Sequence, residues 1–259
     1  DNALYLATLG MALDWDGQVD EAIKNCLRAV ELDPTLPEAH AFLAEAYADR
    51  GQPDKAWDSI QTALELAPDS SLVRRNAAYV LESQGKYTRA IEEYQKAIDL
   101  HPKLVSLYLA LARNYLVLND TESALQQFKK AQQASPDDPV VLDQLGWGYY
   151  SIQDYDRAQT ELEHAIELDP EYAPAYGHLG VTYYVQRNYE AAIPIFEKAI
   201  ELGLDSVEYH YELGLSYVYL DQCDKGMPWL ERALQIDPAA EPAWQGIDIC
   251  EGRHGASRE

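Results

Sequence analysis

The chain has 259 residues, 47% of them hydrophobic, and its 44 acidic residues against 20 basic ones give a formal net charge of −24. This composition predicts a folded chain, and the negative charge argues against binding to nucleic acid, whose phosphates it would repel. No apolar run approaches the roughly 18 residues of a membrane-spanning helix, and no signal peptide is recognisable at the start. We expect a soluble protein, with the cytoplasm favoured. An extracytoplasmic location stays open because the missing initiator Met suggests a chain excised or processed from a longer one.

The sequence repeats itself every 34 residues, which the prolines mark most clearly. They recur at this interval and, after one gap, resume in phase: Pro34, Pro68, Pro102, Pro136, Pro170 and Pro238. A fixed period of this length indicates a repeat architecture. Seven repeats follow without insertion or deletion: 3–36, 37–70, 71–104, 105–138, 139–172, 173–206 and 207–240. We therefore expect residues 1–252 to form a single array closed by a capping helix at 241–252, and residues 253–259 to form a disordered tail.

Each repeat is predicted to be a pair of helices. In the first half, Leu followed by Gly or Ala precedes a Tyr, as at Leu145, Gly146 and Tyr149. In the second half, Ala recurs at two positions seven residues apart, as at Ala158 and Ala165. These spacings are helical, and the short polar segment between them suits a tight turn. Small residues let two helices approach closely, and stacked hairpins bury the apolar stripe that one hairpin alone leaves exposed.

The order of Leu-Gly, then Tyr, then two alanines that flank a large residue such as Phe196, then Pro, resembles the tetratricopeptide repeat. This resemblance implies an all-α fold, namely a right-handed α-solenoid superhelix of antiparallel helix hairpins. It also implies a concave groove, lined by the first helix of each pair, that binds peptides or partner proteins. One known clamp of the family, which holds chaperone tails, uses Lys and Asn where this chain has Ala7 and Met11. A fold of this kind fixes no single biological role.

The fifth and sixth repeats end differently, because the Asp-Pro of the former is replaced by Gly203 and Leu204 in the latter. We expect Gly203 to stop its helix in a left-handed conformation, with Leu204 packing back over the last turn and Asp205 or Ser206 capping the next helix. Prolines lie inside the second helices of the last two repeats, where we expect them to bend or delay those helices. The junction at Gly203 is therefore predicted to be the most deformable of the array, with faster hydrogen exchange from there onward.

Cysteine and histidine give no sign of a metal or redox site. Cys26, Cys223 and Cys250 form no C-x-x-C pair, and we interpret them as buried or bystander thiols, with a bridge between Cys223 and Cys250 left open. The six histidines form no metal-like cluster, and no phosphate loop, H-E-x-x-H or nucleophile elbow occurs. We expect a protein that is not an enzyme and that needs no cofactor or metal.

Candidate binding residues are those that break the repeat on the expected groove face, because packing residues recur whereas residues that recognise a ligand differ. Tyr79, Arg113 and Trp147 occupy one first-helix position in adjacent repeats. The charge is also uneven: repeat 71–104 carries six basic and four acidic residues, whereas repeat 139–172 carries one basic and eight acidic residues. The expected site has these seven residues: Arg75, Asn76, Tyr79, Arg113, Trp147, Tyr150 and Tyr184.

In this hypothesis Arg75, Asn76 and Arg113 hold an acidic side chain or a terminal carboxylate, while the four aromatic residues pack apolar groups of the ligand. The alternative is that the arginines pair with neighbours such as Glu45 or Glu82 and that the tyrosines pack between helices. The function favoured overall is a protein- or peptide-binding scaffold, monomeric rather than assembled. A targeting or regulatory domain of a larger enzyme, secretion or signalling protein stays open, as does a structural assembler that binds itself.

Overall fold

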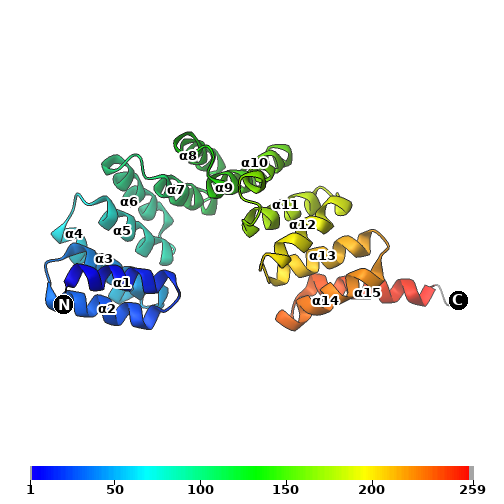
Figure 1. The fold of residues 1–259 in the computed structure, drawn as a ribbon, viewed down its shortest axis with the longest axis horizontal. Helices are drawn as coiled ribbons and strands as arrows, with labels where there is room; N and C mark the ends of the chain where they lie inside the picture. The colour runs from blue at the N-terminus through cyan, green and yellow to red at the C-terminus, as the bar shows by residue number, and fades with distance from the viewer. Residues whose placement is uncertain (1, 257–259) are drawn as a thin grey trace. The chain divides into compact units, whose positions relative to one another are not determined.

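The computed structural model describes residues 2–256, and side chains are described for residues 2–252. It contains two compact units, residues 1–134 and 135–259, which we call unit 1 and unit 2. Every regular element among the described residues is an α-helix, and consecutive helices form antiparallel hairpins (Figure 1). The predicted all-α fold of tandem helix hairpins is therefore confirmed.

Each unit is a run of helices in chain order. Unit 1 consists of α1 (Ala3–Trp15), α2 (Val19–Leu32), α3 (Pro37–Asp49), α4 (Pro53–Leu66), α5 (Ser71–Ser83), α6 (Tyr87–Leu100), α7 (Val105–Val117) and α8 (Thr121–Ala134). Unit 2 consists of α9 (Pro139–Ser151), α10 (Tyr155–Leu168), α11 (Ala173–Val185), α12 (Tyr189–Glu201), α13 (Val207–Tyr219), α14 (Cys223–Ile236) and α15 (Glu241–Ala256). Helix α15 thus continues past the expected end of the capping helix at Gly252, and residues 257–259 of the expected tail lie outside the described residues.

The turn inside every hairpin uses one residue in the left-handed conformation. Its φ lies between 59° and 77°, and the residue recurs every 34 positions as Gly17, Gly51, Gly85, Asn119, Gln153, Arg187 and Asp221. The next residue in the chain then donates its amide back into the helix that has just ended, as Gln18 N does to Leu13 O at 2.8 Å. This satisfies a carbonyl that would otherwise lack a partner at the helix end. The first three turns use Gly, and the last four carry a side chain in a conformation that costs most residues free energy.

The recurring Leu-Gly positions hold the two helices of a hairpin in close contact. A Cβ atom added to Gly146 would lie 2.7 Å from Cγ of Leu162, and one added to Gly180 would lie 2.6 Å from the ring of Phe196. Leu162 and Phe196 are fully buried. A large side chain from the second helix therefore occupies the space that the glycine leaves, which is the packing that the sequence pattern predicts.

The carbonyl oxygens of the recurring prolines accept hydrogen bonds from the following repeat. Six residues after a repeat-ending proline, a side chain of the next first helix donates a hydrogen bond to that proline's carbonyl oxygen, at 2.7 to 3.1 Å. The donors are His40, Arg74, Tyr108, Tyr176 and Trp244. The in-phase position of Trp244, Ile247 and Cys250 in the capping segment predicts that these three residues cover the last hairpin. Ile247 and Cys250 do so, together with Ala243. Trp244 does not, because its bond to the proline carbonyl holds it at the surface, where it is half exposed.

The departure at Gly203 is a helix stop of the Schellman type. Gly203 has a φ of 100°, its amide bonds to Ile200 O at 2.9 Å, and Leu204 N bonds to Ala199 O at 3.1 Å. Ser206 caps α13 by accepting from Tyr209 N, as predicted. Asp205 has a different role, since it binds the ring of His210, the residue that would otherwise have bonded to a proline carbonyl.

The two prolines inside second helices do not delay them. Pro194 lies inside α12 and Pro228 inside α14, and both helices begin several residues before the proline and continue past it. The expectation of a delayed helix is therefore wrong.

A disulfide joins Cys223, the first residue of α14, to Cys250 in α15, with Cα atoms 5.6 Å apart. The interpretation of all three cysteines as separate thiols is wrong for this pair, because α15 folds back over α14 and brings the two sulfur atoms together. Cys26 is free and buried, as expected.

First helices pack closely at the start of unit 1 and separate later. Helix α3 lies against both α1 and α5, whereas α7 contacts α6 and α8 and at most touches α5. Buried alanines such as Ala41 and Ala44 allow the close contact around α3. Arg75 and Tyr79 of α5 bond to Glu45 and Asp49 of α3, and a cavity that both side chains line lies between α5 and α7.

Candidate functional site

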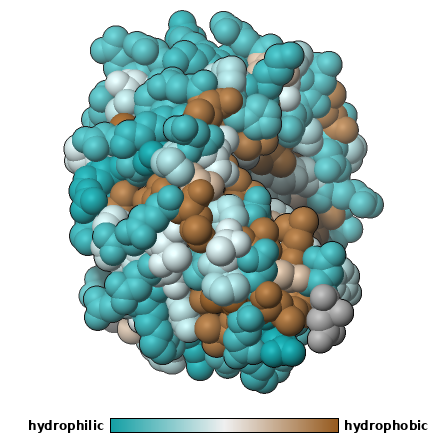
Figure 2. Space-filling model, turned by 90° about the vertical axis from the view of Figure 1, so that its left-hand side faces the viewer, coloured by the Kyte–Doolittle hydropathy of each residue, from teal (hydrophilic) through white to brown (hydrophobic). Residues whose placement is uncertain are grey.

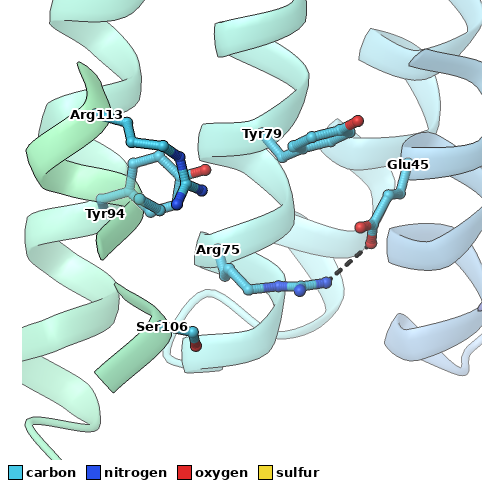
Figure 3. Close-up of a pocket in the computed structure, with 7 residues that line it drawn as sticks. Glu45, Arg75, Tyr79, Tyr94, Ser106 and Arg113 are labelled. Atoms are coloured by element: carbon cyan, nitrogen blue, oxygen red, sulfur yellow. Dashed lines mark hydrogen bonds and ion pairs between the residues drawn. The ribbon is translucent and has the colours of Figure 1, made fainter. Parts of the chain in front are cut away.

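Two adjoining pockets open on the first-helix face of unit 1. The polar pocket has a cavity volume of about 210 Å³ and lies between α5 and α7 (Figure 3). Its lining residues come from α3, α5, α6 and α7: Glu45, Arg75, Tyr79, Tyr94, Ser106, Ala110 and Arg113. Three of the residues predicted for a site, Arg75, Tyr79 and Arg113, thus meet around one cavity.

The second pocket is larger and mainly apolar, with a volume of about 370 Å³. Its walls are Met11, Trp15, Phe42, Ser71, Leu72, Arg75, His101, Leu104 and Ser106. On the face of the molecule that Figure 2 shows, hydrophilic residues cover most of the surface and hydrophobic residues gather in several areas between them. Arg75 and Ser106 line both pockets and form their common wall.

Arg75 is held in place by Glu45 and Asn76. Its Nη2 donates to Glu45 Oε2 at 2.8 Å, and its Nε and Nη2 donate to Asn76 Oδ1 at 2.9 and 2.6 Å. Asn76 is fully buried and donates its own amide to Ala41 O and to Glu45 Oε2, both at 3.0 Å. Asn76 is therefore not at the pocket surface but positions the guanidinium of Arg75. The alternative of pairing with a neighbour holds for Arg75.

Arg113 differs from Arg75 because no acid pairs with it among the described side chains. It is exposed and extends from α7 beside Tyr94 (Figure 3). The neighbouring carboxylate, Glu82, is occupied otherwise, since it accepts from Tyr94 Oη at 3.0 Å and from Asn114 Nδ2 at 2.8 Å. The guanidinium of Arg113, with its forked donors, thus faces the polar pocket uncompensated.

Carboxylates behind Arg75 are kept out of water. Burial raises the pKa of Glu45, against the opposing effects of Arg75 and of the Trp15 indole that donates to it at 3.5 Å. Burial, together with the charges of Asp49 and Glu45, raises the pKa of Asp14 to about 7, and its Oδ1 has no hydrogen-bond partner. Arg75 therefore bonds to a buried carboxylate, Glu45, whose pKa is raised and whose neighbour Asp14 has a pKa of about 7.

The three remaining predicted site residues belong to unit 2 and lie in two aromatic clusters. Trp147 stacks on Tyr150 and on the ring of His178, with centroids 4.5 and 4.4 Å apart. Tyr184 lies 5.8 Å from Tyr189 and 6.5 Å from Tyr219. The rings of Trp147, Tyr150 and His178 are stacked, whereas Tyr184 meets its neighbours edge-on or tilted. All of these contacts lie within unit 2, in agreement with the alternative that the tyrosines pack between helices.

Sequence reasoning missed a contact between successive repeats that both units use. A residue at one first-helix position bonds to the residue 35 places earlier: Asn76 to the carbonyl of Ala41, and His178 Nδ1 to Asp143 Oδ1 at 2.6 Å. The signal in the sequence is that Asn76, His178 and Glu212 share this position in different repeats.

Glu212 has no such bond. The residue 35 places before it is Gly177, which offers no side chain, and an ionised carboxylate cannot donate to a backbone carbonyl as the amide of Asn76 does. Its Oε2 is buried and without a hydrogen bond. Burial, with a contribution from Glu208, raises the pKa of this carboxyl to about 8.

Within residues 2–252, whose side chains are described, no group of His, Cys, Asp and Glu side chains is arranged to hold a metal ion. None of the helices in the same range has the length and the apolar character needed to cross a membrane.

Comparisons with known proteins identify the repeat. A tetratricopeptide repeat model matches residues 3–145, and a second one matches residues 144–206 and 179–241. Tetratricopeptide repeat protein 36 of Caenorhabditis elegans is 38% identical over 65 residues, which are 25% of this chain and 36% of that protein. The chain thus spans well under two thirds of this curated relative.

Solved structures with the same fold include a chain of the APC/C hetero-tetramer Cut9–Hcn1, with a TM-score of 0.77 at 19% identity over 95% of this chain and 48% of that one. YrrB, described as a tetratricopeptide repeat protein with an unusual peptide-binding site, has a TM-score of 0.55 at 22% identity, over 73% of this chain and 97% of that one. At these identities the likeness shows the fold alone. Since the first family model by itself covers more than half of the residues, the chain belongs to the tetratricopeptide repeat family.

Proposed function

We propose that this chain is a non-catalytic scaffold that binds a protein or peptide partner on the first-helix face of unit 1, where the polar and apolar pockets adjoin. Tetratricopeptide repeat proteins are commonly interaction scaffolds and are generally not catalysts. The first-helix face is where residues vary between repeats while the packing positions stay constant.

The observation that carries this proposal is the pair of pockets that share Arg75 and Ser106. Arg113, which pairs with no acid among the described side chains, lines the polar pocket next to the apolar one, and an exposed arginine of this kind contributes little to folding. The same combination is what interfaces use, because Arg and large apolar groups supply most of their binding free energy. An acidic side chain or a terminal carboxylate of the partner fits the polar pocket, since Arg113 offers it two parallel donors.

A capture experiment with a matched pair of variants tests the proposal. The full chain, the Arg113→Glu variant and the Arg89→Glu variant are each used to isolate partners from cells of the source organism. Arg89 is a fair control because it lies on α6 over the ring of Trp57 and lines neither pocket. We expect the Arg89 variant to retain the partner and the Arg113 variant to lose it, with circular dichroism reporting that both are folded. A partner that both variants retain equally would place binding elsewhere.

The aromatic residues Trp147, Tyr150 and Tyr184 are not part of this proposed site, because their ring contacts within unit 2 account for them. A targeting or regulatory role in a larger protein would use the same face of unit 1. The two roles therefore require the same binding by this face. They differ only in whether the protein also contains other domains.

A further inference from the structure

We propose that the paired pockets of unit 1 recognise a short peptide segment in which a bulky apolar side chain stands within two residues of an acidic one, and that the acid of the peptide displaces Glu45 from Arg75. This inference rests on the proposed function, because it names the chemistry that the same face would select.

The spacing of the two ligand groups follows from the shared wall. Arg75 and Ser106 border both cavities, so a group in one cavity and a group in the other are separated by the thickness of one side chain. Along an extended peptide, side chains on one face are about 7 Å apart, which is the distance between alternate residues. Neighbouring or alternate residues of one segment therefore reach both cavities at once.

The polar cavity selects for negative charge. Arg113 has no acid partner among the described side chains, and Arg75 has only one, Glu45, at 2.8 Å. Repeat 71–104, which contributes Arg75, carries a net charge of +2 on a chain whose net charge is −24. A basic ligand side chain would be repelled by both guanidinium groups that line this cavity, whereas a carboxylate would be attracted to both.

The apolar cavity selects for size. Met11, Phe42, Leu72 and Leu104 supply its apolar walls, and its volume of about 370 Å³ accommodates one bulky side chain such as Leu, Met or Phe. Phe42 is buried and forms the floor, while Leu104 stands at the rim with 38% of its side chain exposed. A large apolar group that enters this cavity leaves water, and burial of that kind is the main favourable contribution to binding.

Displacement of Glu45 couples the site to protons. Glu45 faces Asp14 and Trp15 on α1, Asp49 on its own helix, and Arg75, Asn76 and Tyr79 on α5. Of these groups Arg75 carries the positive charge. When a ligand carboxylate takes Arg75, Glu45 is left beside two acids and its pKa rises, so binding takes up a proton. Affinity is therefore expected to increase as the pH falls.

Peptide selection tests the recognition rule directly. Short random peptides displayed on phage are selected on the immobilised full chain and, in parallel, on the Arg113→Ala variant. We expect the wild-type chain to enrich peptides with Asp or Glu within two residues of Leu, Ile, Met or Phe, and the variant not to. Enrichment without the acid, enrichment without the apolar residue, or no enrichment beyond that on the variant would overturn the inference.

A mutant cycle with one enriched peptide then assigns each group to its cavity. Fluorescence anisotropy should show about tenfold weaker binding for Arg113→Ala and also for Leu104→Ser. Serine is chosen because Leu104 is the N-cap of α7, a position that serine favours. After the apolar residue of the peptide is changed to Ala, Leu104→Ser should cause little further loss of affinity.

Two control variants, Arg89→Ala and Leu66→Ser, remove an Arg and an exposed Leu that lie outside both pockets. Neither should change the affinity for the peptide. Full additivity in the cycle would contradict the assignment.

The proton coupling has its own measurement. Wild-type affinity should be several-fold higher at pH 6 than at pH 8, and the dependence should persist in Asp14→Asn but vanish in Glu45→Gln. A flat wild-type profile would show that Glu45 is not displaced. If the native partner needs Arg113 but the selected peptides lack the apolar and acidic pair, this inference fails while the proposed function stands. If the partner ignores Arg113, the proposed function itself fails.

Discussion

Units 1 and 2 use the same 34-residue frame but treat their polar first-helix positions differently. In unit 2, His178 and the fully buried Asp143 form a closed pair beneath Trp147. In unit 1, the equivalent positions hold Asn76 and Arg75, and their bonds leave a guanidinium at the wall of two cavities. The repeat thus determines where helices pack, whereas the residue types at a few variable positions determine whether a face is closed or able to bind.

The two units also differ in how their ends and turns are stabilised. Unit 2 has a disulfide between α14 and α15, a buried carboxylate without a partner at Glu212, and left-handed turns built on residues other than glycine. No disulfide joins the described residues of unit 1, and three of its four turns use glycine. Each difference can be removed by mutation, which gives the following predictions.

The largest effect is expected from the disulfide. The Cys223→Ala, Cys250→Ala variant should lose about 3 kcal/mol of stability in unit 2, because the link closes a loop of 27 residues in the unfolded chain. Hydrogen exchange should show the loss in α14 and α15, with α1 to α6 unchanged. Treatment of the wild-type chain with a reducing agent should reproduce it. Equal loosening of both units would contradict the confinement of this effect to unit 2.

The second effect concerns the unpaired acid of unit 2. Because folding raises the pKa of Glu212 from 4.5 to about 8, the folded chain binds this proton more tightly than the unfolded chain. The stabilisation of the folded chain by the protonated carboxyl of Glu212 is therefore fully present below about pH 4.5 and is lost as the pH rises toward about 8. Glu212→Gln should stabilise the chain by about 2 kcal/mol at about pH 9 and leave it nearly unchanged at about pH 5.

Denaturant unfolding at the two pH values measures this difference. Asp14→Asn in unit 1 should also stabilise the chain at high pH. Because the pKa of Asp14 is raised only to about 7, this gain should appear at a lower pH than the gain from Glu212→Gln. A gain that is equal at both pH values would mean that the carboxyl of Glu212 is not the cause.

A smaller effect is expected at the left-handed turns. Gly51→Ala should destabilise unit 1 by about 1 kcal/mol, because the new Cβ is disfavoured at a positive φ. Gln153→Gly at the equivalent turn of unit 2 should have the opposite sign and a magnitude of about 0.5 kcal/mol. Thermal denaturation of the two variants compares them. If both substitutions destabilise, the side chain of Gln153 has a role at the turn that the backbone conformation does not reveal.

The smallest effect is expected at Gly203. Its helix stop replaces the proline, and the His210 that follows bonds to the exposed Asp205 and not to a proline carbonyl. We expect amide exchange to be faster from this junction onward than at the proline junctions, more so after reduction of the disulfide. Hydrogen exchange measured by mass spectrometry checks this, and uniform protection along the chain would contradict it.

Much of the fold was predictable because it depends on spacing. The recurrence of Leu-Gly, of Ala and of Pro at 34-residue intervals specifies which faces pack, and the glycine contacts at Gly146 and Gly180 follow from it. The Schellman stop at Gly203 was predictable for the same reason, since a glycine in place of a helix-ending proline has few other functions.

The site was predictable only in part. The variable first-helix positions identified Arg75, Tyr79 and Arg113, which the structure brings to one cavity. The pairing of Arg75 with Glu45 was one of two alternatives, because sequence alone does not say which way a long side chain turns. The apolar pocket was missed. Met11 occupies the same first-helix position as Tyr79 and Arg113, but nothing in the sequence indicates that Leu104, at the end of another repeat, lines one cavity with it. The disulfide between Cys223 and Cys250 was left as an open alternative, because the contact depends on how α15 folds over α14.

The bond between Arg75 and Glu45 has a consequence for which molecules the site rejects. A ligand that offers a carboxylate and nothing more would exchange one acid for another on Arg75, with almost no net change in free energy. Acetate, free acidic amino acids and polyacidic chains would thus compete poorly, however abundant they are in a cell. Glu45 would act as a permanent internal competitor, and it sets a threshold that a ligand passes only by also filling the apolar cavity and contacting Arg113.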